Sequence, residues 1–282
     1  MKQVITKIFK FTRFSTILSM VIILFWAFLT VIPIFFMIST AFKDEGLIWK
    51  FPIVWLPNPV TFENYSEVFR YMDVGRMFFN SIYVATVTTV IQALIASFAA
   101  FAFARIRFIG REIVFMGFLA TMMIPQYVLL IPLYIIIARF NLMNTYAALI
   151  IPSMISAFSI FLLRQFFRSI PIDLDESARI DGCNRLQILF RIILPLSQPA
   201  LVSVSIFVFM NSWNNFLWPL LVTSDIKMRL LPLGLSFFQV ANSTKYGPLM
   251  AAALLASAPL IFVFLIAQKR FIEGLALTGI KG

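Results

Sequence analysis

The sequence predicts an all-α integral membrane protein with six transmembrane helices. Only 12% of its 282 residues are charged, against about 25% in soluble domains. Its mean hydropathy is +0.94 and 61% of its residues are hydrophobic, which leaves too little polar surface to face water. The apolar residues also gather into six runs, each long enough to cross a bilayer.

We predict one span for each apolar run. The spans cover residues 14–41, 80–104, 113–138, 147–163, 192–222 and 248–267. The first run is longer than the apolar part of a signal peptide and lacks a small-residue cleavage site, so it predicts a helix that stays in the chain. The second run is rich in Ala, Ser and Thr, which let helices pack closely in lipid. Prolines in the third and fifth runs suit a bundle whose neighbouring helices satisfy the freed carbonyls.

The remaining segments are polar. Residues 43–76 and 223–246 read as long loops, and residues 171–191 form a polar loop between the fourth and fifth spans. We therefore predict a short N-terminus (1–13), one transmembrane domain (14–270) and a short C-terminal tail (271–282).

Charge orients the spans. With the N-terminus inside and the spans alternating, 15 of the 23 basic residues fall on the inner side. Such an excess marks cytoplasmic segments, whereas acidic residues contribute little. Both termini and the polar loop are therefore predicted to be cytoplasmic, in a multi-pass protein of a bacterial cell membrane.

Several kinds of chemistry are excluded. The chain has no histidine and one cysteine, Cys183, so we expect no catalytic residues, no disulfide framework and no metal site. The basic residues flank apolar runs and form no single patch, so the net charge of +11 indicates lipid and not nucleic acid. The nearest approach to a phosphate-binding loop begins at Gly274, but Ile280 stands where lysine is needed.

The polar loop predicts a short helix along the inner membrane surface. Asp173 can act as its N-cap, with Glu176 three residues later as in a capping box. Gly182 either ends the helix or lets another backbone approach. The alternative is a plain surface loop whose arginines contact lipid head groups.

The same loop resembles the signature loop of permease subunits from binding-protein-dependent ABC importers. That signature reads Glu-Ala-Ala, three residues, Gly, nine residues, Ile, one residue, Leu-Pro. Here it begins at Glu176, reaches Gly182 and closes at Ile192, Leu194 and Pro195. Ser177 in place of alanine is the one departure, and it replaces a small residue with a small one.

Further segments resemble the carbohydrate-importing branch of that family, whose members are similar to the maltose permease G protein. They are residues 162–167, 178–182, 213–220 and 268–271. The resemblance implies the type I ABC importer permease fold, with a cytoplasmic coupling helix in the polar loop. It also implies four kinds of partner: a second, different permease subunit, two ATPase subunits that bind ATP and Mg, an extracytoplasmic substrate-binding protein, and a carbohydrate substrate. The tail resembles a family segment that reaches toward the ATPases, and its alternative is a frayed terminus.

The resemblance also implies which residues couple the permease to the ATPase. In the family this loop forms a helix that sits in a cleft of the ATPase. Glu176 would be the charged contact, Ala178 and Gly182 the close-packing contacts, and Arg179 and Asp181 the flanking polar contacts. Ser177 completes this set.

The fifth span supplies a candidate substrate pathway. Polar groups at membrane depth are costly and normally face a bundle interior or a water-filled path. On a helix, Asn211, Asn214, Asn215 and Trp218 share one face, and Trp213 lies among them in sequence. Neutral amides bond hydroxyl groups and an indole offers an apolar face to a sugar ring. The alternative is that the asparagines bond between helices and that the tryptophans are interfacial anchors.

Three other classes compete with an importer subunit. A stand-alone secondary transporter or channel would usually show more spans, repeat symmetry and acidic residues within the spans, and the six predicted spans contain no Asp or Glu. A membrane enzyme would need a richer set of reactive side chains. The interpretation as a eukaryotic receptor depends only on two glycosylation-type triplets, which begin at Asn64 and Asn242.

Overall fold

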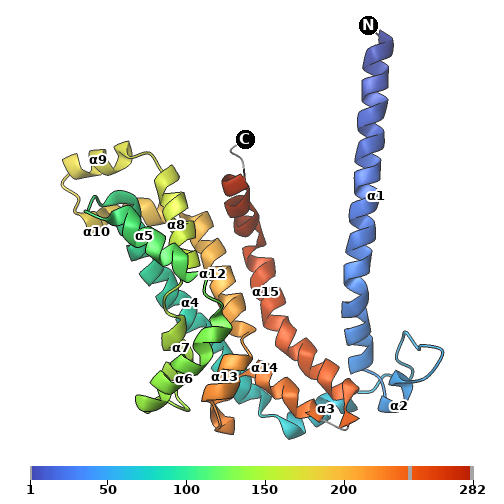
Figure 1. Ribbon diagram of the computed structural model, residues 1–282. Helices are drawn as coiled ribbons and strands as arrows, with labels where there is room; N and C mark the ends of the chain where they lie inside the picture. The colour runs from blue at the N-terminus through green and yellow to red at the C-terminus, as the bar shows by residue number, and fades with distance from the viewer. Residues whose placement is uncertain (1, 241–242, 280–282) are drawn as a thin grey trace. The chain divides into compact units, whose positions relative to one another are not determined.

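The computed structural model describes residues 2–240 and 243–279, with side chains for residues 16–239, 244–266 and 268. The chain divides into two compact units. One unit comprises residues 1–72 and 237–255, and the other comprises residues 73–236 and 256–282. Figure 1 labels most helices of both.

The first unit joins the end of a long N-terminal helix to the start of the last helix. Its helices are α1 (Lys2–Ala41), α2 (Glu45–Ile48) and α3 (Glu63–Tyr71), followed by the two-residue strands β1 (Gln239–Val240) and β2 (Ser243–Thr244) and the start of α15 (Tyr246–Gly279). Strands β1 and β2 pair antiparallel. The predicted loop 43–76 thus contains two short helices and the first residues of α4.

Asn64 holds this unit together. Its side-chain amide is buried and donates to the carbonyls of Ala41 (3.0 Å) and Lys43 (2.7 Å). A Cβ at Gly247 would collide with the Asn64 side chain, so glycine at this position lets α15 begin against α3.

The second unit is built around one uninterrupted helix, α4. Its helices are α4 (Val74–Arg105), α5 (Arg111–Thr121), α6 (Leu130–Arg139), α7 (Tyr146–Ile150), α8 (Ala157–Ser169), α9 (Asp173–Ile180), α10 (Arg185–Ile188), α11 (Leu194–Leu196), α12 (Gln198–Trp213), α13 (Leu217–Val222) and α14 (Leu231–Gly234). Five short non-α helical segments lie among or after them. Four are 3₁₀-helices: η1 (Gln126–Leu129), η2 (Ile151–Ser153), η4 (Ile226–Met228) and η5 (Leu235–Phe238). The fifth, η3 (Leu189–Ile193), is a π-helix. Helix α4 packs along both α8 and α12.

The all-helical membrane fold is confirmed, with three to six candidate spans, of which three are continuous helices. Residues 16–41, 74–105 and 246–266 each form one helix long and apolar enough to cross a membrane. The other three spans are bent pairs: α5 with η1 and α6 at 88°, α7 and η2 with α8 at 46°, and α10–α11 with α12 at 82°. Counting each pair as one span gives the predicted number.

Several helices differ in extent from the predicted spans. Helix α4 begins at Val74, six residues before the predicted start of the second span, because Asp73 caps it by accepting the N–H of Arg76. Ile192 lies inside the fifth candidate span and does not begin it, because this bent pair starts at Arg185 and turns at Ser197 into α12. Glu112 lies in the first turn of α5, so one candidate span does contain an acid. Helix α15 continues through the predicted tail to Gly279, and residues 280–282 lie outside the described part.

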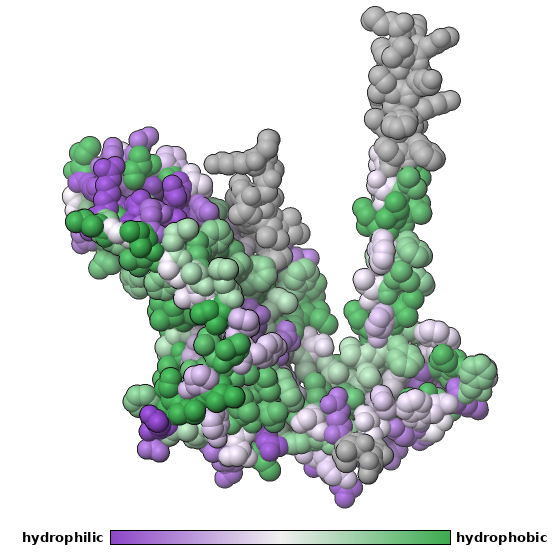
Figure 2. Space-filling view, viewed as in Figure 1, coloured by the Kyte–Doolittle hydropathy of each residue, from purple (hydrophilic) through white to green (hydrophobic). Residues whose placement is uncertain are grey.

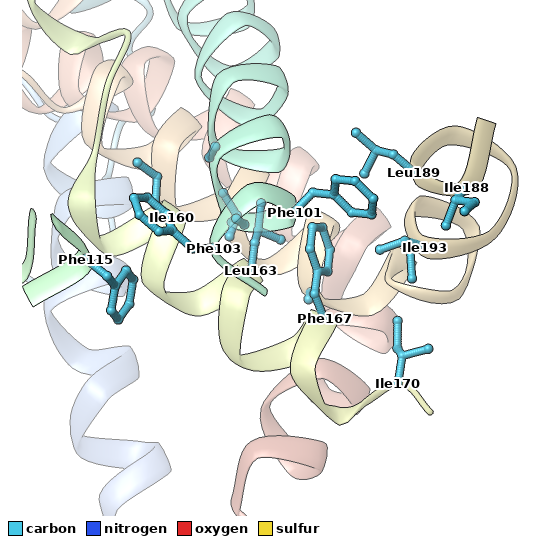
Figure 3. Packing of buried hydrophobic residues seen from close by; sticks show 14 of the residues in the cluster. Phe101, Phe103, Phe115, Ile160, Leu163, Phe167, Ile170, Ile188, Leu189 and Ile193 are labelled. Carbon is cyan, nitrogen blue, oxygen red and sulfur yellow. The ribbon is translucent and has the colours of Figure 1, made fainter. Parts of the chain in front are cut away.

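One hydrophobic core of the second unit is at the Arg105 end of α4. Aromatic and aliphatic side chains from four segments meet there: Phe101 and Phe103 of α4, Phe115 of α5, Ile160, Leu163 and Phe167 of α8, and Ile188, Leu189 and Ile193 beyond α9 (Figure 3). Small residues such as Ala96 and Ala100 are fully buried in α4. They let the neighbouring helices approach closely, as the composition of this span predicted.

A buried arginine joins α8 to the two helices beside it. The side chain of Arg164 is 4% exposed and donates to both carboxylate oxygens of Glu112, at 2.7 and 2.8 Å. Its Nε also donates to the carbonyl of Phe103 (3.2 Å). The guanidinium lies 3.9 Å from the centre of the Phe115 ring, a cation–π contact.

We predict that Arg164→Met destabilises the second unit. The change removes a bond to a backbone carbonyl and a buried cation–π contact, so we expect a loss of about 2 kcal/mol in the free energy of unfolding. Thermal unfolding of the purified protein in detergent measures this. Arg168→Met is the matched control, because Arg168 is on the same helix and exposed. Equal midpoints for the two variants would contradict the role assigned to Arg164.

Candidate functional site

The polar loop 171–191 stands out as a hydrophilic surface over α9 and α10 (Figure 2). Helix α8 ends at Ser169, and Ile170 is extended because the residue before a proline avoids the helical region. Pro171 is followed within two residues by α9. The predicted short helix is confirmed.

The predicted N-cap of α9 was wrong. Asp173 is the first helical residue and makes no capping bond, and the N-cap is Ile172. The carbonyl of Ile172 accepts the N–H groups of Asp175 (2.9 Å) and Glu176 (3.2 Å). The acids of the first turn still suit the positive end of the helix dipole.

Gly182 ends α9 in a left-handed conformation. Its φ is +84°, which side chains disfavour. The N–H of Cys183 donates to the carbonyl of Ala178 (2.9 Å) and the N–H of Gly182 to that of Arg179 (3.0 Å). These two bonds form a Schellman motif, which closes the last turn of a helix. A Cβ on Gly182 would meet nothing within 4 Å, so backbone conformation and not space requires glycine here.

Helix α9 has a buried face and an exposed face. Asp175 and Ala178, three residues apart, are 1% and 5% exposed, and Ala178 belongs to the core cluster of this chain. Its small size therefore already serves packing within the subunit. The other four residues that the resemblance selected in α9 and its cap are exposed: Glu176, Ser177, Arg179 and Asp181.

The exposed face also carries an apolar residue that the sequence analysis did not select. Ile180 is 87% exposed and lies one turn beyond Glu176. An aliphatic side chain held in water on an ordered helix is a natural contact for another protein. Its signal in the sequence was an isoleucine between two charged residues.

A capping box begins the segment after α9. The side chain of Asn184 accepts the N–H of Gln187 (2.9 Å), and the side chain of Gln187 accepts the N–H of Asn184 (2.8 Å). The sequence analysis missed this signal, an asparagine followed three residues later by glutamine. This capping box starts α10. The chain then passes through the π-helix η3 to α11 and bends into α12.

The second candidate site is a cavity of about 730 Å³ within the second unit. Its wall is formed by α4, η1, the start of α8, the end of α12 and the segment from Asn214 to Trp218. All of its lining side chains lie within the described residues, and none of them is charged. Serine, threonine, asparagine and glutamine side chains supply most of its polar groups.

The structure brings the predicted amides together, but not on one helix. Helix α12 ends at Trp213 and α13 begins at Leu217, so the continuous helical face was wrong. The break places Asn211, Asn214, Asn215 and Trp218 on the cavity wall all the same. Non-helical backbone at membrane depth is tolerated where it lines a cavity.

The two tryptophans of this region pack into the protein. Trp213 is 2% exposed, does not line the cavity, stacks on Phe209 and donates its indole N–H to Ala256 (3.0 Å). Trp218 is 6% exposed and donates to the carbonyl of Ala148 (2.9 Å). Both indole N–H groups are therefore occupied, and Trp218 offers the cavity only part of its ring.

Helix α4 contributes polar residues that the sequence analysis missed. The Gln92 amide donates to the Ser159 hydroxyl (2.7 Å) across the cavity wall. Thr88, one turn away, is 1% exposed, and its hydroxyl has no hydrogen-bond partner among the described residues. A buried polar atom without a partner is costly, so a ligand that reached this hydroxyl from the cavity would gain a hydrogen bond. Its signal was a polar pair at i and i+4 within an apolar span.

A metal centre finds no support. No group of three or more Cys, Asp or Glu side chains in the described part of the chain could hold an ion. A multi-pass helical bundle with a polar internal cavity and an exposed surface helix defines a membrane transport subunit.

The comparison with known families gives the particular class. Residues 92–276 match the family described as "Binding-protein-dependent transport system inner membrane component", and the chain belongs to this family. It is thus a multi-pass permease subunit of a bacterial inner-membrane ABC transporter, whose ATPase activity lies in a separate subunit.

Curated relatives cover nearly the whole chain. The arabinooligosaccharides transport system permease protein AraQ of Halalkalibacterium halodurans is 33% identical over 261 residues, covering 92% of this chain and 94% of its own. The diacetylchitobiose uptake system permease protein DasC of Streptomyces coelicolor is 35% identical, with 89% and 92% covered. The lactose transport system permease protein LacG of Rhizobium radiobacter is 32% identical, with 88% and 90% covered.

A solved structure shares the fold. A chain of a bacterial ABC transporter involved in the import of the acidic polysaccharide alginate superposes with a TM-score of 0.81. The two chains are 23% identical, and the match covers 92% of this chain and 97% of the other.

We predict that Gly182→Ala loosens the end of α9. The left-handed backbone costs a residue with a Cβ about 1 kcal/mol, so exchange of the Gly182 and Cys183 amide hydrogens should accelerate. Hydrogen–deuterium exchange measures this directly.

Gly117→Ala is the control for this substitution. Gly117 lies inside α5 with open space around it, and alanine is favoured within helices. Unchanged exchange at the end of α9 in Gly182→Ala would show that the Schellman bonds do not depend on glycine.

Proposed function

We propose that this chain passes a neutral oligosaccharide or sugar derivative from an extracytoplasmic binding protein into the cytoplasm. The cavity carries the proposal, because it offers hydrogen-bonding groups and aromatic surface without charge. The relatives support it, since their names refer to arabinooligosaccharides, diacetylchitobiose and lactose.

The chemistry of the cavity suits hydroxyl-rich ligands. Each Asn and Gln side chain both donates and accepts hydrogen bonds, as a sugar hydroxyl does. Phe216, Trp218 and Tyr127 add aromatic surface for the apolar face of a pyranose ring. A volume of about 730 Å³ lies within the range that holds small organic ligands. Asn211, Asn214 and Asn215 would bond the sugar together with Thr88 and Gln92. Trp213 would support this wall from behind.

The exposed face of α9 would dock on the separate ATPase. Glu176 would supply the charged contact and Ile180 the apolar one, flanked by Ser177, Arg179 and Asp181. Ala178 and Gly182 would shape the helix from within, by packing and by ending it. The polar loop and both chain ends would then face the cytoplasm. Two ATPase subunits, a second permease subunit and a substrate-binding protein would complete the transporter.

The family match disfavours a stand-alone secondary transporter. Glu112 is the one acid inside the candidate spans of the described residues, and it is bonded to Arg164 at the start of α5. It is therefore not placed to carry a coupling ion through the bundle.

We predict that Glu176→Lys releases the ATPase subunits. The reversed charge would face the partner surface that Glu176 contacts, and like charges at an interface cost several kcal/mol. Co-purification of the ATPase with a tagged permease measures the loss. Glu63→Lys is the control, because Glu63 is an exposed acid in the first turn of a helix in the other unit. Full retention of the ATPase by Glu176→Lys would refute docking through α9.

We predict that Thr88→Val weakens sugar transport while the complex stays assembled. The loss of one ligand hydrogen bond, about 0.5–1.5 kcal/mol, corresponds to a two- to tenfold rise in the sugar concentration at half-maximal uptake. Proteoliposome uptake of arabinooligosaccharides, lactose and diacetylchitobiose is the measurement.

Thr89→Val is the matched control for Thr88→Val. The Thr89 hydroxyl donates to the carbonyl of Ala85 in its own helix (2.7 Å), and Thr89 does not line the cavity. Indistinguishable uptake by the two variants would argue against a ligand contact at Thr88.

A further inference from the structure

Helix α9 is tied to the end of α4 by a buried ion pair. Arg105 Nε lies 3.4 Å from Asp175 Oδ2, and the two side chains are only 5% and 1% exposed. Arg105 also donates through Nη2 to the carbonyl of Ile170 (2.8 Å), just before α9. One side chain at the last turn of α4 thus holds both the start and the buried face of α9.

The same helix reaches the cavity. Helix α4 runs from Val74 to Arg105 without a break, and Gln92 and Thr88 lie 13 and 17 residues before Arg105. At about 1.5 Å per residue these positions are roughly 20 and 25 Å along the helix axis. Because α4 is packed against α8 and α12 along this length, a displacement at Arg105 is carried to the cavity wall by a single stiff element.

Stability does not explain this ion pair well. Burial raises the pKa of the Asp175 carboxyl above its usual value, in spite of the opposing effect of Arg105. Neither Asp175 carboxylate oxygen has a hydrogen-bond partner among the described residues. A buried pair with this geometry contributes little net stability, and it does fix the relative position of the two groups.

We propose that Arg105 and Asp175 are positioning residues that transmit the movement of α9 along α4 to the cavity wall at Gln92 and Thr88. This inference rests on the proposed docking of an ATPase on α9. It adds the contact between Arg105 and Asp175, which lies outside the docking face of α9 and on which coupling between the ATPase and the cavity depends.

Packing also holds α9 in place, so the ion pair can be tested without losing the helix. Ala178 and Ile170 belong to the core cluster beside Phe167. In Asp175→Asn, Arg105 keeps its bond to Ile170, and α9 keeps its apolar contacts. We expect the helix to remain docked on the ATPase but to move independently of α4.

The experiment reads the cavity wall directly in the assembled transporter. In a Cys183→Ser background, Thr88→Cys places a single thiol on α4 at the cavity. The rate of its reaction with a membrane-impermeant maleimide is measured in the nucleotide-free complex and in the complex trapped with MgATP and vanadate. If the trapped state exposes a conformer that is otherwise minor, the rate should change about tenfold or more in the parent.

Asp175→Asn should bring the two rates close together while the ATPase subunits stay bound. Asp173→Asn is the matched control, because Asp173 is an exposed acid in the same turn of α9, and it should retain the parental difference. The exchanged pair, Arg105→Asp with Asp175→Arg, should restore the difference at least in part.

If Asp175→Asn fails to assemble, Arg105→Lys replaces it. Lysine keeps the charge but lacks the planar fork that reaches Asp175 and Ile170 together, so the rate difference should shrink.

Each outcome separates this inference from the docking proposal. A parental difference preserved in Asp175→Asn, with bound ATPase, would overturn the transmission role and leave docking intact. Equal rates in the parent itself would also overturn it. If the double variant Arg105→Asp with Asp175→Arg assembles but does not restore the difference in labelling rate, the ion pair is not the essential contact. Glu176→Lys that keeps its ATPase would instead refute the docking on which the inference rests.

Discussion

Close packing around α4 is the constraint on which the second unit depends. Lipid gives helices no hydrophobic reason to associate, so they must approach closely enough for van der Waals contact to hold them. Ala85, Ala96 and Ala100 are at most 1% exposed and give α8 and α12 room to do so. A larger side chain at any of these positions would move α8 or α12, and so would change the cavity and the seat of α9.

The parts that sequence reasoning predicted are those controlled by local composition. Apolar runs located the six spans because a bilayer requires about 20 apolar residues per helix. Pro171, the acids that follow it and Gly182 located α9, since each acts through its own backbone or its neighbours. The three amides of the fifth span line one cavity although the helix assumed for them breaks, because all three lie within a few residues of that break.

The parts that escaped prediction depend on contacts distant in sequence. The pairing of Arg105 with Asp175 joins residues from different helices, and no local sequence pattern predicts it. The inward direction of Trp213 depends on the carbonyl of Ala256, which lies 43 residues later in the chain. The bend at residues 154–156 likewise looks like ordinary apolar sequence, whereas Pro125 marks the one at residues 122–125. Thr88 and Gln92 were visible as polar residues, but only the fold shows that they share a wall with α12.

The bond between Arg164 and Glu112 bears on how the chain is built into a membrane. An arginine in a span adds about 2.5–3.5 kcal/mol to the cost of insertion at the bilayer centre, and less toward its edge. Glu112 is synthesised 52 residues earlier, so a neutralising partner is already present when α8 leaves the ribosome. The helix made first thus carries the acid that neutralises the arginine of the helix made later.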